Sequence, residues 1–243
     1  MTEAPIIEIF SSFQGEGTHA GERHLFVRFQ DCELACKWCD TPSTFVENKY
    51  CRVEFPPFSR KVKFYPNPVS VPALVEILQP FAEGTIAVTG GEPLQKVPFL
   101  KEWLPLVKGK KILLETAGVH TPELRELIGL VDIVSMDIKL SSSTGMHPWW
   151  REHDGFLQVA RQKEVYVKIV VTGETEDRHI EKAAALVAAQ DPKIPVILQP
   201  ASPTAKFRAL PSADQLGRWQ AIATAVLSDV RVLPQIHKQL GVG

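Results

Sequence analysis

The 243 residues are 44% hydrophobic and 23% charged, with a net charge of −1, a composition that predicts one sizeable folded core and excludes extended disorder. The basic residues are scattered rather than gathered in a stripe, so the electrostatic footprint of a nucleic-acid-binding protein is missing. Acidic residues stand where a secretory signal needs basic ones, and no apolar run approaches the length of a membrane span, so we expect a cytoplasmic protein without membrane contact.

The first predicted strand is HLFVRF, residues 24–29. Its alternation places Leu25, Val27 and Phe29 on one face and Arg28 on the other, beside Phe26. A guanidinium on a covered strand needs an anionic partner. That partner is either a protein carboxylate or a ligand.

Residues 46–72 follow a different pattern. Five prolines, interleaved with aromatic and basic residues, exclude a long helix and predict an insertion packed over the domain surface. We interpret this insertion as a lid or flap that is held by its own aromatic side chains.

Further along, short β-branched runs alternate with segments of helical periodicity. Strands are expected at 85–91, 111–118, 132–140, 165–171 and 194–200, and helical segments at 97–108, 122–129, 154–163, 176–189 (capped by Thr175) and 212–228. Repeated strand-then-helix units predict a parallel sheet covered by helices. We expect an α/β fold, a partial TIM-like barrel of about six parallel strands, with a doubly wound open sheet as the alternative. Both collect functional groups at the carboxyl ends of the strands.

Three of the four cysteines, Cys32, Cys36 and Cys39, follow the first strand with the spacing C-x3-C-x2-C. In a reducing compartment such a group favours metal binding over a disulfide. A structural zinc site needs four ligands, usually as two separated pairs, whereas Cys51 stands apart in the insertion and is interpreted as a structural thiol. Three clustered thiolates fit a [4Fe–4S] cluster with one iron open to a further ligand. Zinc and simple thiol packing remain as alternatives.

The segment TGGEP, residues 89–93, ends the next predicted strand. Its two glycines allow a ligand to approach the backbone, and Glu92 supplies a carboxylate for an ammonium group; a purely structural turn is the alternative. In DIVSMDIKL, residues 132–140, period-2 alternation puts Ser135, Asp137 and Lys139 together on one face. Three polar residues on a buried strand indicate a lined cavity. Lys168 either joins this cavity or pairs with Asp137.

Together, the C-x3-C-x2-C motif with Trp38 before its third cysteine and the G-G-E segment resemble the radical S-adenosylmethionine (SAM) enzymes. The resemblance covers the whole chain. It implies a radical SAM core with a [4Fe–4S] cluster whose open iron chelates SAM. We therefore expect a single radical SAM domain over residues 1–243, with substrate and cluster loops at 11–45. In such an enzyme the insertion at 46–72 has a second interpretation, as a docking surface for an electron-donating protein such as flavodoxin or ferredoxin.

The N-terminal region is more specific. EIFSSFQGEGTHAGERHLFVR (8–28), W-C-D-T (38–41), SMDIK (135–139), LQP (198–200) and PQIHKQLG (234–241) resemble the 7-carboxy-7-deazaguanine synthase family. The resemblance implies a carbon–nitrogen lyase that converts 6-carboxy-5,6,7,8-tetrahydropterin into 7-carboxy-7-deazaguanine with loss of ammonia, in queuosine-type 7-deazapurine biosynthesis. It implies that the reduced cluster cleaves SAM to a 5′-deoxyadenosyl radical, which abstracts hydrogen from C6 of the substrate, and that SAM is regenerated. A homodimer belongs to the same expectation.

The resemblance also implies roles for individual residues, in addition to the three cysteines as cluster ligands. The implied SAM contacts are Trp38, Asp40, Gly91, Glu92, Ser135, Asp137 and Gln199. The implied substrate contacts are Phe13, Gln14, Gly15, Glu16, Arg28, Thr89 and His237. Thr41 would coordinate Mg²⁺, a hard cation that takes oxygen ligands. No side chain is assigned as catalytic, because the cluster and SAM carry the chemistry.

The chain departs from the family pattern at two places. Asp31 stands where many members have glycine, and Gly243 stands where some members end in a proline whose carboxylate reaches the substrate. Two other functions are weighed against this one. A glycyl-radical activating enzyme shares the cluster and the G-G-E segment but gives no reason for Gln14–Gly17 or Arg28, and a zinc-binding module explains the cysteines without redox chemistry.

Overall fold

The computed structural model describes residues 2–242, so Gly243 lies outside the described residues. Ten strands of this part of the chain form one sheet in the order β12-β11-β10-β9-β8-β7-β3-β2-β4-β5. The seven from β12 to β3 are mutually parallel, β2 is antiparallel to β3, and β5 is antiparallel to β4. The strands are β2 (Ile6–Phe13), β3 (Arg23–Phe29), β4 (Tyr50–Glu54), β5 (Val62–Pro66), β7 (Thr85–Gly90), β8 (Lys111–Thr116), β9 (Ile133–Asp137), β10 (Glu164–Val171), β11 (Val196–Pro200) and β12 (Val230–Val232); β1 (Glu3–Ala4) and β6 (Val69–Ser70) form a separate pair.

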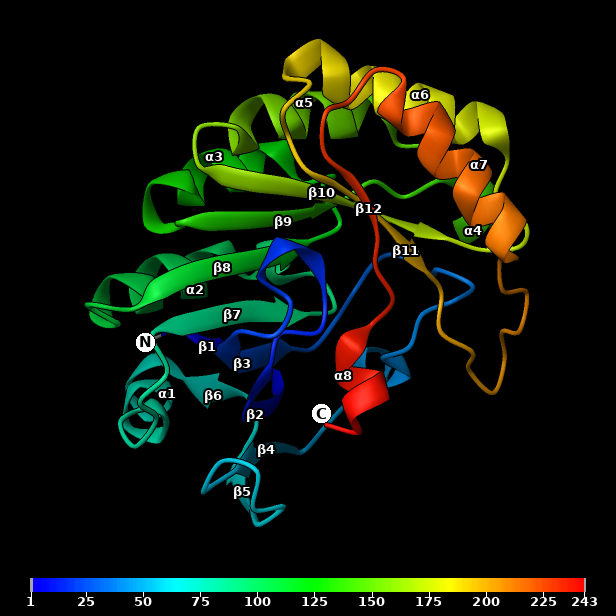
Figure 1. Ribbon diagram of the computed structural model, residues 1–243. Helices are drawn as coiled ribbons and strands as arrows, with labels where there is room; N and C mark the ends of the chain where they lie inside the picture. Colours follow the sequence, from blue (N-terminus) through cyan, green and yellow to red (C-terminus); the bar gives the residue numbers. More distant parts are fainter. Residues whose placement is uncertain (1, 243) are drawn as a thin grey trace.

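Helices cover the outer face of this curved sheet, and the loop between β2 and β3 crosses its inner side (Figure 1). The helices are α1 (Val71–Leu78), α2 (Val97–Trp103), α3 (Thr121–Leu127), α4 (Ser141–Thr144), α5 (Trp150–Ala160), α6 (Asp177–Gln190), α7 (Ala213–Thr224) and α8 (Ile236–Leu240). Short 3₁₀ turns lie at Gly17–His19, Pro42–Phe45, Pro93–Lys96, Leu104–Leu106 and Ile128–Leu130. Because the two edge strands β12 and β5 do not pair with each other, the barrel is partial.

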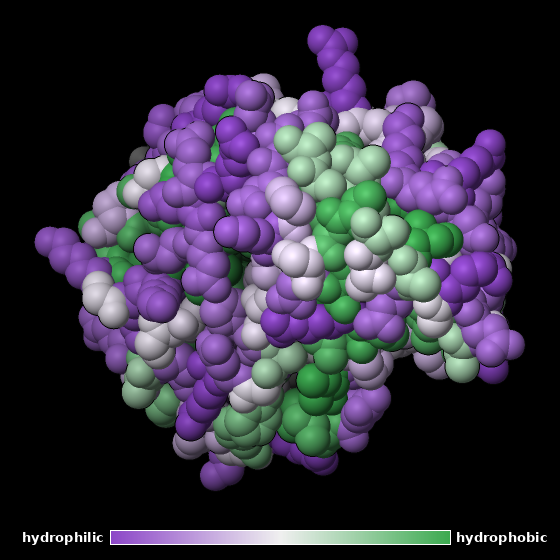
Figure 2. Space-filling model, turned by 45° about the horizontal axis from the view of Figure 1, so that its top comes forward, coloured by the Kyte–Doolittle hydropathy of each residue, from purple (hydrophilic) through white to green (hydrophobic). Residues whose placement is uncertain are grey.

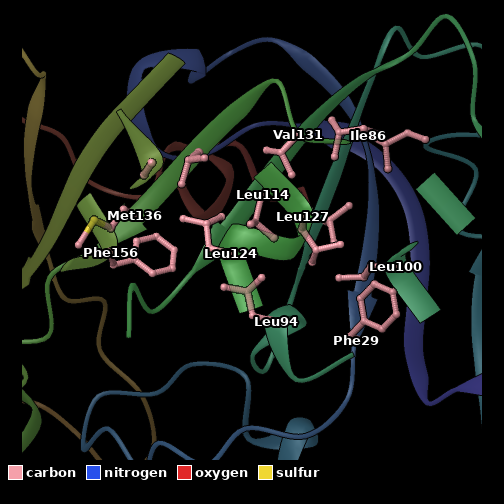
Figure 3. Close-up of a cluster of buried hydrophobic side chains, with 14 of the residues drawn as sticks. Phe29, Ile86, Leu94, Leu100, Leu114, Leu124, Leu127, Val131, Met136 and Phe156 are labelled. Atoms are coloured by element: carbon pink, nitrogen blue, oxygen red, sulfur yellow. The ribbon is translucent and has the colours of Figure 1, made fainter. Parts of the chain in front are cut away.

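The period-2 alternation of the strands divides the apolar residues into two cores. The outer core packs strand residues against the helices; in Figure 3, Leu114 of β8 lies beside Leu124 and Leu127 of α3. The inner core contains Phe10, Phe26, Ala87, Leu113, Ile133, Tyr166 and Ile197, one from each of seven strands. The outer face therefore holds the helices, and the inner face is free to carry a site.

The same alternation places polar residues above the inner core. Two positions beyond Phe26, Ala87, Leu113, Tyr166 and Ile197 stand Arg28, Thr89, Glu115, Lys168 and Gln199, and Asp137 stands four positions beyond Ile133. Residues two apart on a strand share a face, and β3 and β7 to β11 run in parallel. These polar side chains are therefore brought together at the carboxyl edge of the sheet.

The predicted parallel α/β architecture is confirmed, with three corrections. Residues 46–72 form no separate flap, since β4 pairs with β2 and the β4–β5 hairpin extends the main sheet. Thr175 does not cap α6, because its hydroxyl accepts from the Thr172 N–H and the N-cap residue is Glu176. Strand β2 and the seventh parallel strand, β12, were not predicted.

None of the helices in the described chain is long and apolar enough to cross a membrane. The face shown in Figure 2 is mostly hydrophilic, with smaller hydrophobic areas between the polar residues.

Candidate active site

A pocket opens at the carboxyl edge of the sheet. It is lined by Glu16, Arg28, Cys32, Leu34, Cys36, Trp38, Cys39, Asp40, Thr41, Thr44, Thr89, Gly90, Gly91, Glu115, Thr116, Ala117, Asp137, Lys139, Lys168, Val170, Gln199, Ala201, Ser202 and Gln235. These residues come from the loop after β2, from the cluster loop after β3, from the ends of six strands and the residues just beyond them, and from the C-terminal segment. Segments far apart in the sequence thus contribute to one site, as expected for the carboxyl face of a barrel.

The three clustered cysteines line this pocket as free thiols, each partly exposed. Burial raises the pKa of the Cys32 thiol to about 12 and also raises that of Cys36. Thiols in such surroundings ionise when a metal centre supplies positive charge. Cys51 is fully buried in β4 within the outer core and does not line the pocket. The donor set is therefore three thiols without a fourth, which fits a cluster with one open iron.

The cluster loop is fastened to the end of β7. The Asp31 carbonyl accepts from the Glu92 N–H at 2.9 Å, and a Cβ on Gly91 would overlap that carbonyl. Glycine is therefore required at 91 for this close approach. Asp31 itself has φ 72°, a left-handed conformation, and its carboxylate pairs with Lys96 at 2.6 Å.

The Glu92 side chain stabilises the turn after β7 by accepting three hydrogen bonds. Its buried carboxylate accepts from the Leu94 N–H at 3.0 Å, the Thr116 hydroxyl at 2.8 Å and the Ala117 N–H at 2.8 Å. Burial raises the pKa of Glu92, and these three hydrogen bonds oppose the shift. The carboxylate thereby connects the ends of β7 and β8 and does not line the pocket.

Buried charges form the floor of the pocket. Lys168 pairs with Glu16 and lies 3.4 Å from Asp137, which also pairs with Lys139. Burial alone would raise the pKa values of both carboxyls and lower that of Lys168, but the opposite charges prevail: the carboxyl pKa values are lowered and that of Lys168 lies well above its usual value. All three groups are therefore charged near neutral pH.

Several buried polar atoms of the pocket lack a hydrogen-bond partner among the described residues. They are Trp38 Nε1 and Gln199 Oε1, while Asp137 Oδ1 has only the 3.4 Å ion pair with Lys168. An unsatisfied buried polar group costs about 1–3 kcal/mol, so a ligand that supplies the missing partners is favoured. All three belong to residues for which the sequence predicted SAM contacts, and the residues present thus fit that cofactor.

The C-terminal segment closes one side of the pocket. Gln235 donates to Asp40 at 3.0 Å and to Glu16 at 2.6 Å, and Lys238 donates to Asp40 at 2.6 Å. Burial would raise the pKa of Asp40, but Lys238 and Gln235 outweigh it and hold that pKa well below its usual value. His237 packs against Gly15, on which a Cβ would overlap the imidazole ring.

Arg28 faces the pocket and also has a protein partner. Its Nε lies 2.9 Å from Glu8, whose other oxygen pairs with Arg52 at 3.2 Å, and its guanidinium lies over the Phe10 ring. The two readings of Arg28 from the sequence are thus compatible, because the ion pair orients a guanidinium that is still 21% exposed.

Some of the residues expected to contact a ligand lie elsewhere. Phe13 is exposed and packs against Phe58, Gln14 is buried with its amide on Glu115 at 2.8 Å, and Ser135 is buried beneath the pocket. Conversely, Glu115 and Gln235 line the pocket although no role was predicted for either. The signal for Glu115 was present, since it follows the apolar run Ile112–Leu114 near the carboxyl end of a predicted strand and shares a face with Leu113.

Comparison with known proteins places this geometry in context. No protein-family model matches the chain. A 7-carboxy-7-deazaguanine synthase from Geobacter sulfurreducens is 39% identical, over 98% of this chain and 97% of that protein. Another, from Thermococcus kodakarensis, is 32% identical over 97% of both chains.

Solved structures agree on the fold. The crystal structure of QueE from Escherichia coli matches 96% of this chain and 94% of its own, with a TM-score of 0.61 at 23% identity. SuiB from Streptococcus suis, bound to S-adenosylmethionine, matches 84% of this chain and 48% of its own, with a TM-score of 0.54 at 13% identity. Because the relatives from Geobacter sulfurreducens and Thermococcus kodakarensis are 39% and 32% identical over nearly the whole chain, the chain belongs to the 7-carboxy-7-deazaguanine synthase family.

Proposed function

We propose that this protein converts 6-carboxy-5,6,7,8-tetrahydropterin into 7-carboxy-7-deazaguanine with loss of ammonia, as a radical SAM lyase. The observation that carries the proposal is the convergence of three free thiols, Arg28, Asp137 and the unsatisfied polar atoms of Trp38 and Gln199 on one pocket. When bound, the [4Fe–4S] cluster and SAM supply the radical chemistry.

The chain's own residues bind and orient. Cys32, Cys36 and Cys39 would hold the cluster. Trp38, Asp40, Gly91, Asp137 and Gln199 would surround SAM, with Glu92 and Ser135 supporting that site from beneath. Thr41, whose hydroxyl lies 3.3 Å from Asp40, would contribute an oxygen ligand to Mg²⁺.

The substrate would lie between the cluster loop and the floor of the pocket. Arg28 would clamp its carboxylate, because a guanidinium binds a carboxylate through charge-assisted hydrogen bonds. Glu16 and Thr89 would contact the pterin directly, while Phe13, Gln14, Gly15 and His237 would shape the loop and the C-terminal wall around it. The ion pairs of Lys168 with Glu16 and Asp137 hold these three groups in their charged forms at the floor of the pocket.

The proposed activity also needs a reducing compartment and an electron donor. A reducing cytoplasm would keep the cluster thiols free, and a flavodoxin- or ferredoxin-like protein would supply the electron. The hairpin β4–β5, with exposed Tyr50 and Phe64, offers aromatic surface for such a donor or for the second subunit of a homodimer. No contact with nucleic acid or membrane is proposed.

The test is anaerobic reconstitution followed by incubation with dithionite, SAM and the carboxylated tetrahydropterin, with detection of the deazaguanine product. Cys36→Ala should lose both the brown chromophore and turnover. Cys51→Ala is the matched control, because it removes a thiol outside the pocket, and it should retain about four irons and activity. A colourless wild-type protein that loses zinc on the Cys36→Ala change, or an active Cys36→Ala variant, would refute the proposal.

A further inference from the structure

A second group of ligand-type side chains lies at the opposite edge of the sheet from the pocket. His24 is the second residue of β3 and Glu164 is the first residue of β10, while His19 and Glu22 belong to the loop between β2 and β3. The parallel strands from β3 to β10 all begin at this edge. The group is therefore separate from the active site, which lies where the strands end.

The ligand atoms of this group are gathered closely enough to hold a metal ion. One Glu22 oxygen is 3.1 Å from His19 Nδ1, and the other is 3.4 Å from His24 Nε2. One such atom from each of the three residues lies within 4.8 Å of the others. Ligands at about 2.0–2.1 Å in a tetrahedron around Zn²⁺ stand about 3.3 Å apart. By contrast, 3.4 Å is long for a hydrogen bond between nitrogen and oxygen, which centres on about 2.9 Å.

The chemistry of His19 supports an ion at this place. Its Nε2 lies 2.8 Å from Glu164, so the ring has a carboxylate on each nitrogen. If the neutral ring donates Nε2–H to Glu164, its Nδ1 lone pair faces the Glu22 carboxylate. These two acceptors repel each other unless a second proton or a cation lies between them. Metal-bound histidines typically donate the other N–H to a carboxylate, which is the arrangement of Glu164 here.

His24 turns its Nε2 toward the group. It is 1% exposed, its Nδ1 has no hydrogen-bond partner among the described residues, and the Nε2 contact with Glu22 is long. The nearby Tyr166 ring and Phe26 close the inner side of the group.

We propose that His19, Glu22 and His24 bind one Zn²⁺ ion at the amino edge of the barrel, with Glu164 orienting His19 and water completing the coordination. Glu22 and His19 belong to the loop that carries Gln14 and Glu16 toward the pocket. The ion would therefore hold the part of this loop that contains His19 and Glu22 against the first residues of β3 and β10. Its role is structural and does not depend on the radical reaction.

The test separates this site from the cluster cysteines. The full-length variant with Cys32, Cys36 and Cys39 all changed to Ala is freed of metal by chelation and titrated with Zn²⁺ or Co²⁺. We expect one equivalent to bind and the melting temperature to rise. Bound Co²⁺ should show visible d–d bands without the near-ultraviolet band of a thiolate ligand, because the ligands are nitrogen and oxygen.

Variants in the same background identify the ligands. Glu22→Gln and His24→Gln should each weaken Zn²⁺ binding at least tenfold, and Glu164→Gln by about tenfold, as for other residues that orient a metal-bound histidine. Since His24 is buried and its replacement carries a risk of misfolding, the exposed Glu22 gives the decisive variant. His147→Gln, at an exposed histidine outside the group, is the control and should bind as the parent does. Failure to bind one equivalent, or equal binding by Glu22→Gln and the control, would overturn the site.

Discussion

Arg28 belongs at once to the pocket and to the framework, and its two roles are separable. Replacing it by Ala should raise the KM for the carboxylated pterin by about 10- to 100-fold with a smaller change in kcat, because a hydrogen bond to a charged group contributes about 1.5–3 kcal/mol. Steady-state kinetics at saturating SAM measure this. Arg52→Ala is the matched control, since Arg52 pairs with the same Glu8 at 3.2 Å without lining the pocket. Equal effects from both variants would mean that Glu8, and not the substrate, is the partner that matters.

Asp31 shows how a departure from the family pattern is accommodated. A non-glycine residue at φ 72° costs about 1–2 kcal/mol, and the ion pair with Lys96, in which the Asp31 side chain is 47% exposed, returns at most about 1 kcal/mol. Asp31→Gly should therefore leave the free energy of unfolding of the cluster-free protein unchanged or raise it by up to about 1 kcal/mol.

Denaturant titration measures that change, and Lys96→Met isolates the ion pair, for which a loss of less than about 1 kcal/mol is expected. A strongly destabilised Asp31→Gly variant would show that the carboxylate holds the cluster loop by more than this pairing.

At the residue scale, the alternation along a strand predicted which way each side chain points, but it did not predict which groups the side chain bonds with. Period 2 correctly turned Arg28 and Asp137 toward a cavity, because side-chain direction on a strand is a local property. Two of the three partners of Glu92, Thr116 and Ala117, come from the end of β8, more than 20 residues away, and no local pattern contains that information.

Helix α5 is connected to the active-site edge through one histidine. Buried His153 accepts from the Lys139 N–H at 2.9 Å and contacts the Gly118 carbonyl at 2.9 Å, so it joins the segments that follow β8 and β9. Burial lowers the pKa of His153 to about 4, more than the Gly118 hydrogen bond raises it. Between pH 6.5 and 4 the unfolded chain therefore takes up a proton that the folded chain does not, and stability falls as the pH falls.

This difference predicts a loss of about 2 kcal/mol from His153 on going from pH 8 to pH 5. His153→Gln, which keeps a donor and an acceptor, should flatten that part of the pH dependence in denaturant titrations of the cluster-free protein. The control His147→Gln, at an exposed position, should keep the wild-type slope. A slope unchanged by His153→Gln would assign the pH dependence to other groups.

At the element scale, the repeated strand–helix units could be predicted from the sequence, whereas strands β2, β4, β5 and β12 could not. The strands from β7 to β11 are short β-branched runs whose type follows from composition and spacing. Strand β2 has the sequence IIEIFSSF, but its antiparallel pairing with β3 and its contact with β4 depend on distant partners. Likewise Thr175 was a plausible cap by residue type, but its hydroxyl is used within the preceding turn.

At the scale of the whole molecule, we propose that the chain forms a single domain. The outer core includes Ala4 near one end and Val230 near the other, and helices α1, α2, α3, α5, α6 and α7 contribute residues to it. Both ends of the chain also reach the site, since the loop after β2 and the start of α8 contact each other there: the Ile236 N–H donates to the Gly15 carbonyl at 2.9 Å. The two ends together close one side of the pocket.

Gly15 lies at the contact between the loop after β2 and α8, so a substitution there tests whether the two ends close the pocket. A Cβ at this position would overlap the ring of His237, so Gly15→Ala must displace either the loop or α8. We expect a KM for the pterin at least tenfold higher, and faster amide exchange over residues 236–242, with unchanged iron content, because the cysteines lie on another loop.

Gly217→Ala is the matched control. A Cβ at Gly217 meets no atom within 4 Å, and the residue lies within α7, where alanine is favoured by about 0.5–1 kcal/mol. This variant should keep the wild-type KM and exchange rates while gaining stability. If Gly15→Ala behaves in the same way, then the C-terminal segment is not held over the pocket by the loop, and the substrate contacts expected of Glu16 and His237 are independent of each other.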